Sequence, residues 1–184
     1  MIVSRRILDA ITLLDPQPGE ELFEIGCGTG QAIEALLARA PDARVDAIDR
    51  SERAVARALQ VNREAVARGR VTIAVGDIEQ GPATKRPRRR GFAIRVNTFW
   101  TRPGIAIPHL AASLRPDGEI WILYDTREAK IEQPIKRSFT DAGWSVRRVS
   151  GPGAFGLVCS PLHGTGHRAV SARQRFGRQR FPIT

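Results

Sequence analysis

The chain has few of the residues that mark several common kinds of site. Of its 184 residues, two are cysteine, one is tyrosine and one is methionine, and aromatic residues make up 6%. The two cysteines, Cys27 and Cys159, provide neither a disulfide framework nor the ligand spacing of a metal site. With so few aromatic side chains, the hydrophobic core is expected to be mainly aliphatic.

Long apolar runs are also missing. None approaches the roughly 20 residues that a membrane-spanning helix needs. The segment 1–14 carries Arg5, Arg6 and Asp9 among its apolar residues and has no small-residue cleavage site. This pattern favours an amphipathic helix over a signal peptide. We therefore expect a cytoplasmic protein that makes no contact with a membrane.

The net charge of +10 is concentrated in two segments. Residues 85–90 carry five positive charges, and the segment after Leu162 carries five more and no acid, so the rest of the chain is balanced. Either segment could contact nucleic acid or an acidic substrate, or could be a solvated, mobile stretch. No RNA-binding module is recognisable, and among the basic residues only Phe176 and Phe181 offer stacking surfaces.

The apolar pattern predicts strands that alternate with helices. Helices are expected at 1–14, 32–37, 51–69, 107–114 and 134–142. Strands are expected at 21–25, 44–48, 71–75, 92–97, 119–124, 144–149 and 154–159. The order implies an α/β fold, a doubly wound, seven-stranded, mostly parallel sheet with a C-terminal antiparallel hairpin. We assign residues 1–161 to one domain and residues 162–184 to a basic, flexible tail.

Two stretches interrupt this pattern. Residues 81–90 are rich in proline and basic residues, which predicts a loop without a helix. Residues 115–118, Arg-Pro-Asp-Gly, are a strong turn signal before the fifth strand.

The most informative segment is 24–30, Glu-Ile-Gly-Cys-Gly-Thr-Gly, which joins the first strand to a helix. Glycine lets the backbone turn sharply and approach a ligand closely. The start of the following helix offers free N–H groups to electronegative atoms. A dinucleotide-binding fingerprint needs a third glycine at position 31, which is Gln31 here. The spacing therefore points away from NAD.

Three glycines at alternate positions, with an acid two residues before the first, resemble motif I of the class I S-adenosylmethionine (SAM) dependent methyltransferases. The resemblance runs from about residue 5 to residue 160, and residues 114–119 are similar to the family's Leu-x-Pro-Gly-Gly turn. It implies that the loop surrounds the methionine part of SAM and that Glu24 lies near its amino group. The loop residues concerned are Gly26, Cys27, Gly28 and Gly30.

The same resemblance assigns the rest of the cofactor site. Asp49, which closes the second strand, matches the acid that binds the ribose hydroxyls, and a carboxylate suits this role because it accepts two strong hydrogen bonds. Asp77 and Ile78, after the third strand, match the segment that reads adenine. Arg50 and Asn97 complete the expected cofactor-binding set. Taken singly, each segment is equally compatible with a tight turn or a helix cap, but the strand ends converge on one crevice.

Methyl transfer requires mainly that nucleophile and methyl group be aligned at about 3–3.5 Å. A general base is needed only if the nucleophile must lose a proton. The candidate catalytic residues are His109, Tyr124 and Asp125, and no metal is expected; His109 is equally compatible with a surface position. Residues 97–100 resemble the Asn-Pro-Pro-aromatic motif of amino-methyltransferases, but both prolines are absent, which favours a polar strand end followed by core aromatics.

The acceptor is not fixed by these motifs. No insertion is long enough to be a lid domain, so the site must be covered by the first helix, by residues 81–91 or 98–108, by the tail, or by the second subunit of a homodimer. We expect a small-molecule acceptor, such as one from secondary metabolism, and S-adenosylhomocysteine as the other product. One alternative is an RNA, DNA or protein methyltransferase that uses residues 85–90 and the tail as contacts. Another is a SAM-binding subunit that has lost catalysis.

Overall fold

The structure, a computed structural model, describes residues 3–125 and 129–162. Its helices are α1 (Arg5–Leu14), α2 (Gln31–Arg39), α3 (Glu52–Val61), α4 (Arg63–Ala67), α5 (Thr98–Thr101), α6 (Pro103–Ser113) and α7 (Ala129–Asp141). Its strands are β1 (Glu21–Ile25), β2 (Arg44–Asp49), β3 (Val71–Val75), β4 (Arg88–Ile94), β5 (Leu114–Tyr124), β6 (Trp144–Gly151) and β7 (Ala154–Pro161). Apart from Leu162, the predicted basic tail lies outside the described residues.

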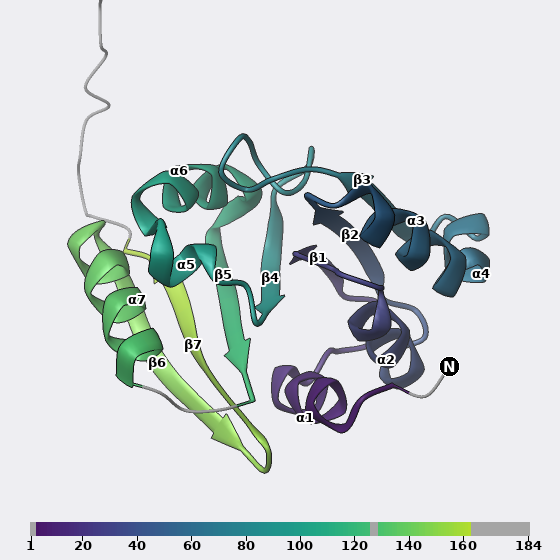
Figure 1. Ribbon diagram of the computed structural model, residues 1–184, viewed down its shortest axis with the longest axis horizontal. Helices are drawn as coiled ribbons and strands as arrows, with labels where there is room; N and C mark the ends of the chain where they lie inside the picture. Colours follow the sequence, from purple (N-terminus) through teal and green to yellow (C-terminus); the bar gives the residue numbers. More distant parts are fainter. Residues whose placement is uncertain (1–2, 126–128, 163–184) are drawn as a thin grey trace, which may run out of the picture.

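The strands form one seven-stranded sheet in the order β3-β2-β1-β4-β5-β7-β6 (Figure 1). β1 to β5 run parallel, and β7 is antiparallel to both β5 and β6. The prediction of a doubly wound sheet with a C-terminal antiparallel hairpin is confirmed. The reversal of strand order at β1 and β4 creates the crevice in which such sheets bind ligands.

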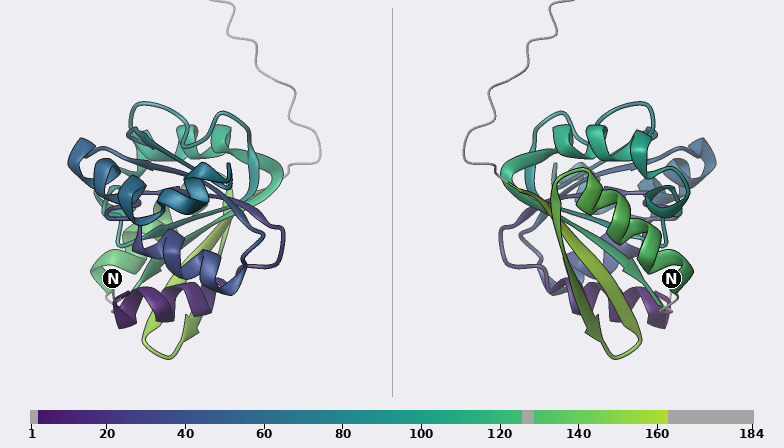
Figure 2. Two further views of the ribbon diagram at one scale, coloured as in Figure 1. Left: turned by 90° about the vertical axis from the view of Figure 1, so that its right-hand side faces the viewer. Right: turned by 90° about the vertical axis from the view of Figure 1, so that its left-hand side faces the viewer.

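Helices cover both faces of the sheet (Figure 2). Residues from α1, α2 and α3 build the core on one face, and residues from α5, α6 and α7 build the core on the other. β1 serves both cores because neighbouring side chains of a strand point to opposite faces. Leu22 joins the first core and Phe23 the second, and both are fully buried.

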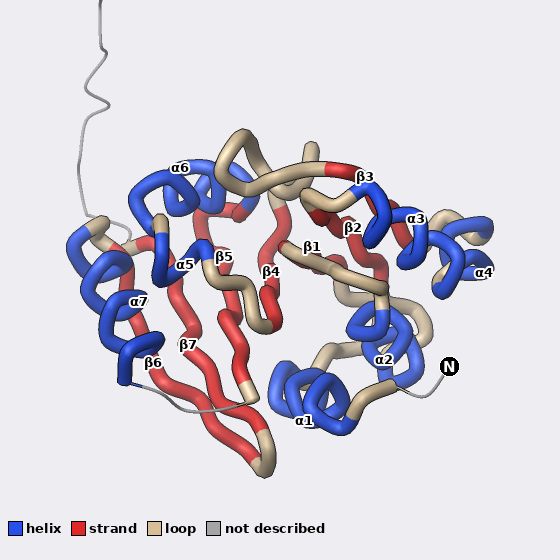
Figure 3. Tube along the Cα trace, in the orientation of Figure 1, coloured by secondary structure: helices blue, strands red, loops and turns tan. Residues whose placement is uncertain are grey.

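The prediction of a basic loop at residues 81–90 is wrong for the last three residues. β4 begins at Arg88, so Arg88 and Arg90 lie inside a strand and their side chains are only 15% and 14% exposed. Both guanidiniums are paired with carboxylates from β1, β2, β5 or the turn before β1: Arg88 with Glu21 and Asp46, Arg90 with Glu20 and Glu119. The sequence shows a run of like charge, but the pairing sheet supplies the opposite charges. The connection before β4 contains no helix, as predicted (Figure 3).

Other boundaries also differ from the prediction: β4 ends at Ile94 rather than at residue 97, the helix expected at 51–69 is divided into α3 and α4, and α5 was not expected. α6 begins at Pro103, because a proline is tolerated in the first turn of a helix, where no intrahelical N–H bond is lost. Residues 115–118 are not a separate turn but an irregularity within β5, where the register shifts opposite Arg89. α7 includes Pro134 in its interior rather than in its first turn. None of the described helices is long and apolar enough to cross a membrane.

Candidate functional site

The three glycines of the loop after β1 all adopt left-handed backbone conformations. Their φ angles are 73° at Gly26, 53° at Gly28 and 80° at Gly30. Residues with a Cβ rarely occupy this region, so each position favours glycine. A Cβ on Gly26 would approach Val96 to 2.7 Å, whereas a Cβ on Gly28 would meet nothing within 4 Å. Gly28 is therefore required by its backbone conformation alone.

Hydrogen bonds hold this loop against β2 and α3. The carbonyl of Ile48 accepts from the backbone N–H groups of Gly26 and Cys27, at 2.8 and 3.1 Å. At the far end, Nδ2 of the buried Asn62 donates to the carbonyl of Gly30 at 3.0 Å. Asn62 lies between α3 and α4, and the sequence analysis did not single it out. Its hydrogen bond joins residues 32 positions apart, so no local pattern in the sequence signals it.

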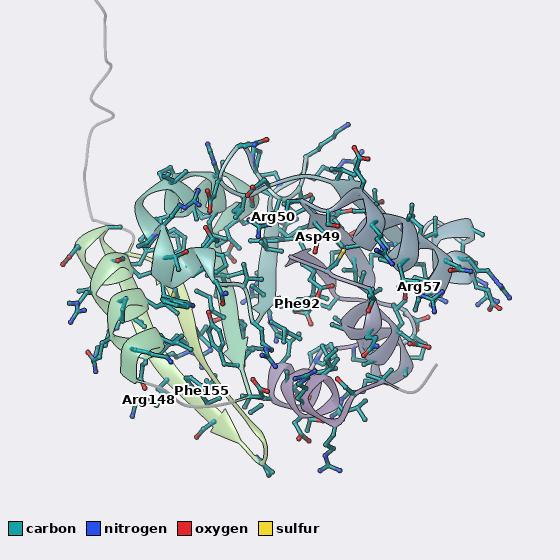
Figure 4. All side chains as sticks on the ribbon, in the orientation of Figure 1. Asp49, Arg50, Arg57, Phe92, Arg148 and Phe155 are labelled. Atoms are coloured by element: carbon teal, nitrogen blue, oxygen red, sulfur yellow. The ribbon has the colours of Figure 1, made fainter. Side chains whose placement is uncertain are left out.

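Asp49, the last residue of β2, is anchored through both carboxylate oxygens. Oδ2 accepts from the N–H of Gly28 at 2.8 Å, and Oδ1 accepts from the N–H of Ser51 at 2.9 Å. Ser51 in turn caps α3, because its hydroxyl accepts from the N–H of Ala54. These bonds fix the carboxylate beside the glycine loop. The side chains of Asp49 and Arg50, at the end of β2, are labelled in Figure 4.

A cavity of about 470 Å³, which we call the first cavity, lies beyond the ends of the parallel strands. Five of the predicted cofactor-binding residues besides the glycines line it together: Asp49, Arg50, Asp77, Ile78 and Asn97. Oδ1 of Asp77 accepts from the N–H of Glu79 at 2.9 Å, and within the described chain no hydrogen bond reaches its Oδ2. That oxygen is free to accept a hydrogen bond from a ligand.

A second cavity of about 300 Å³ adjoins the first. The two share Gly26, Ile94 and Arg95 in their linings. The second cavity is also lined by most of the remaining predicted loop residues, Glu24, Cys27 and Gly28, and by two residues of α1, Arg6 and Ile7. The glycine loop thus lies between two adjoining cavities.

Glu24 is the most unusual group in this site. It is 2% exposed, and its Oε2 has no hydrogen-bond partner in the described chain. Burial, and to a lesser degree the nearby Asp49, raises the pKa of Glu24 to about 8. Burial without a partner is unfavourable for a carboxyl group. A hydrogen-bond donor bound in the second cavity would relieve it.

Cys27 is also buried, and burial raises the pKa of its thiol to about 12, with Glu24 and Asp49 contributing in the same direction. The side chain therefore remains a neutral thiol at physiological pH. Its contribution to the site is to fill the loop rather than to act as a nucleophile.

The three candidate catalytic residues lie in different surroundings. His109 is on α6, lines neither cavity, and its Nδ1 lies 2.8 Å from the carbonyl of Ile78. Tyr124 is buried against Phe155, its hydroxyl donates to the carbonyl of Val96, and burial raises its pKa. Asp125 lies at the end of β5 and pairs with Arg95. His109 and Tyr124 therefore brace the backbone around the site, and their catalytic roles remain predictions.

Several residues at the site were missed by sequence reasoning. Glu79 accepts a hydrogen bond from the hydroxyl of Thr98 and another, of 2.9 Å, from Arg102. All three line the first cavity, as do Arg95 and Thr101. They lie in the segments that follow β3 and β4, so their place beyond the strand ends was the available signal. Arg6 comes from the first helix, which was expected only as one of several possible covers for the site.

Comparison with known proteins gives a consistent picture. A family model described as a methyltransferase domain matches residues 22–118. Protein-L-isoaspartate O-methyltransferase of Aeropyrum pernix is 32% identical over 130 residues, which cover 70% of this chain and 47% of that protein. The chain thus spans about half the length of this curated relative.

Solved structures share the fold at low identity. A SAM-dependent methyltransferase from Aquifex aeolicus has a TM-score of 0.68 and 18% identity, over 84% of this chain and 90% of the other. The pyocyanin biosynthetic protein PhzM has a TM-score of 0.71 and 17% identity, over 85% of this chain and 54% of the other. The family match covers more than half of the chain and includes the glycine loop, Asp49 and Asp77. The chain therefore belongs to the class I SAM-dependent methyltransferases.

Proposed function

We propose that this chain transfers the methyl group of SAM to a small-molecule acceptor. The observation that carries the proposal is the convergence of three carboxyl groups, Glu24, Asp49 and Asp77, on two adjoining cavities separated by the glycine loop. These hydrogen-bond acceptors lie at the ends of the first three strands and match three parts of one extended ligand. Glu24 matches the amino group, Asp49 the ribose and Asp77 the adenine amine.

The residues present fit SAM. Glu24 offers a buried, unpartnered oxygen to an ammonium group in the second cavity. In the first cavity, Asp49 is oriented by Gly28 and Ser51, and Asp77 keeps one oxygen free for an exocyclic amine. Ile78, on the same wall, provides apolar surface for a flat ring.

SAM, when bound, supplies a methyl carbon activated by its sulfonium: the acceptor's nucleophilic atom bonds to this carbon as the carbon–sulfur bond breaks, and S-adenosylhomocysteine leaves. The chain's own residues orient the two reactants and exclude water. The residues shared by both cavities, Gly26, Ile94 and Arg95, mark where the acceptor must approach. Asn97, Thr98 and Arg102 extend this surface towards α5.

The pairing of Arg88 and Arg90 supports a small-molecule acceptor over nucleic acid. Both guanidiniums already contact carboxylates, so they offer little to a phosphate backbone. In addition, PhzM, with the same fold, is described as a pyocyanin biosynthetic protein. A protein acceptor is the second candidate, and the 32% identity to protein-L-isoaspartate O-methyltransferase favours it.

The test is incubation of the full chain with methyl-radiolabelled SAM and a fractionated cell extract. We expect the label to enter the small-molecule fraction. Label in protein would support the second candidate, and label in RNA would contradict the proposed acceptor class. SAM binding without transfer to any fraction would indicate a binding subunit rather than an enzyme.

A further inference from the structure

Two arginines from distant parts of the chain share one carboxylate beside the second cavity. Nη1 of Arg95 lies 3.1 Å from Oδ2 of Asp125, and Nη1 of Arg6 lies 3.9 Å from the same oxygen. Both arginines line the second cavity, whereas Asp125 does not. Their side chains remain about half exposed, at 49% for Arg95 and 56% for Arg6. Each can therefore still reach a ligand.

The backbone holds Arg95 in an unusual conformation at this point. Its φ angle is 60°, in the left-handed region that non-glycine residues rarely adopt. A hydrogen bond of 2.9 Å from its N–H to the carbonyl of Leu123 keeps it there. Such conformations persist only where the surrounding structure imposes them, and they cluster at ligand sites. The conformation places this side chain at the junction of the two cavities.

Arg6 is positioned by the attachment of α1 at both ends. Near its start, the N–H of Ser4 donates to Oε1 of Gln31, which directly follows the glycine loop. At its far end, the carbonyl of Leu14 accepts from Arg90. α1 also packs against α2 and the end of the sheet. The helix is thus fixed relative to the second cavity.

Arg6, Arg95 and Asp125 together carry an excess of positive charge, which suits the binding of an anion. In the described chain, two guanidiniums face the single carboxylate of Asp125, which leaves one positive charge over. The neighbouring Arg5 is not part of the group, because it pairs with Asp9 at 2.9 Å. Guanidinium groups bind carboxylates through strong, charge-assisted hydrogen bonds.

The same cavity contains the buried carboxyl of Glu24, whose Oε2 has no partner in the described residues. A site with cations and a carboxyl group in one small cavity is complementary to an α-amino acid, which carries a carboxylate and an ammonium on one carbon. We propose that Arg6 and Arg95 bind the α-carboxylate of the methionine end of SAM, while Glu24 binds its ammonium. This inference rests on the proposed function, and it makes α1 part of the cofactor site.

Calorimetric titration with SAM and with decarboxylated SAM tests the assignment. We expect the wild-type chain to bind SAM about tenfold more tightly than decarboxylated SAM, because only SAM carries the carboxylate that makes the charge-assisted contact. Arg6→Gln should weaken SAM binding about tenfold and leave the affinity for decarboxylated SAM unchanged. Arg5→Gln, on the adjacent residue outside the cavity, is the control and should behave like the wild type. Arg95→Asn, which tolerates the left-handed conformation, should reproduce the effect of Arg6→Gln.

Several outcomes would overturn the assignment. Equal wild-type affinity for the two ligands would show that the carboxylate is not recognised. An Arg6→Gln protein that matches Arg5→Gln, or that loses affinity for both ligands equally, would show that Arg6 does not bind the carboxylate. In each of these cases SAM still binds the wild-type chain, so the proposed function stands. If the wild-type chain bound neither ligand, the proposed function would fail together with this inference.

Discussion

The backbone N–H of Gly28 donates a hydrogen bond of 2.8 Å to Oδ2 of Asp49, and this bond joins the glycine loop to the end of β2. The two residues are 21 positions apart. The bond is possible because β1 and β2 are parallel neighbours, so their ends lie at the same edge of the sheet. The loop that would surround the methionine part of SAM and the carboxylate that would bind its ribose are therefore one connected unit.

Replacing Gly28 by alanine is expected to disturb this unit through the backbone. The residue has a φ angle of 53°, and a Cβ would meet no atom within 4 Å, so the cost is conformational, about 1–2 kcal/mol. Gly19 is a matched control, because it has a φ angle of 71°, equally open surroundings and a position away from both cavities. Both alanine variants should lower the melting temperature similarly. Only Gly28→Ala should also weaken SAM binding in calorimetry, and equal SAM affinity in the two variants would contradict the assigned role.

Asp49→Ala removes the carboxylate assigned to the ribose hydroxyls. Hydrogen bonds to a charged group contribute about 1.5–3 kcal/mol, which corresponds to a loss of SAM affinity of roughly 10-fold to 100-fold. Asp42→Ala, at an exposed residue before the same strand, should leave the affinity unchanged. Titration of both variants with SAM measures the difference, and an unaltered dissociation constant for Asp49→Ala would refute the ribose contact.

The buried carboxyl of Glu24 predicts a pH dependence of stability in the unliganded protein. Its pKa is raised from 4.5 to about 8, first by burial and then by Asp49, so the folded state binds this proton more tightly than the unfolded state. The stabilisation is fully present below pH 4.5 and is lost as the pH rises towards 8. Each pH unit in this interval removes up to about 1.4 kcal/mol.

Urea unfolding of the unliganded chain across this pH range measures the effect. Glu24→Gln keeps the shape of the side chain but cannot ionise. It should therefore lose less stability than the wild type between pH 5.5 and 8, because it has no proton whose binding differs between the folded and unfolded states. Parallel curves for the two proteins would contradict the raised pKa. If Glu24 ionises to hold an ammonium group, SAM binding near pH 7 should also release a proton, which appears as a dependence of the binding heat on the buffer.

Asn62 is expected to stabilise the C-terminal end of the glycine loop. It is 5% exposed, and its Nδ2 donates to the carbonyls of Gly30 and Ala58, both at 3.0 Å. Asn62→Asp keeps the shape but can replace a donor by an acceptor, so it should destabilise the fold more than Asn62→Ala, by about 1–3 kcal/mol. Thermal unfolding of the two variants provides the comparison. The reverse order would mean that side-chain volume, rather than these two hydrogen bonds, determines the contribution of Asn62.

The features that sequence predicted well are those determined by neighbouring residues. The strand before Gly26, the alternate glycines and the acid at Asp49 each depend on a short segment, and together they indicate both the sheet and the cofactor. The left-handed φ angles at all three glycines explain physically why this spacing is informative. The helix cap at Ser51 is predictable for the same reason.

The features that sequence missed depend on contacts between distant segments. Arg88 and Arg90 belong to a strand rather than a loop because Asp46, Glu20 and Glu119 compensate their charge, and no local pattern reveals those partners. Residue type alone also gave no sign that His109 would lie outside both cavities. Likewise, the approach of Arg6 to the end of β5 follows from the packing of α1 and cannot be read from the helix itself.

The central claim is that this site binds SAM, and equilibrium binding of methyl-radiolabelled SAM to the full chain tests it most directly. The fold and the spacing of Gly26, Gly28 and Gly30 predict saturable binding that S-adenosylhomocysteine displaces and NAD does not. Absence of saturable binding, or displacement by NAD as effective as that by S-adenosylhomocysteine, would contradict the account.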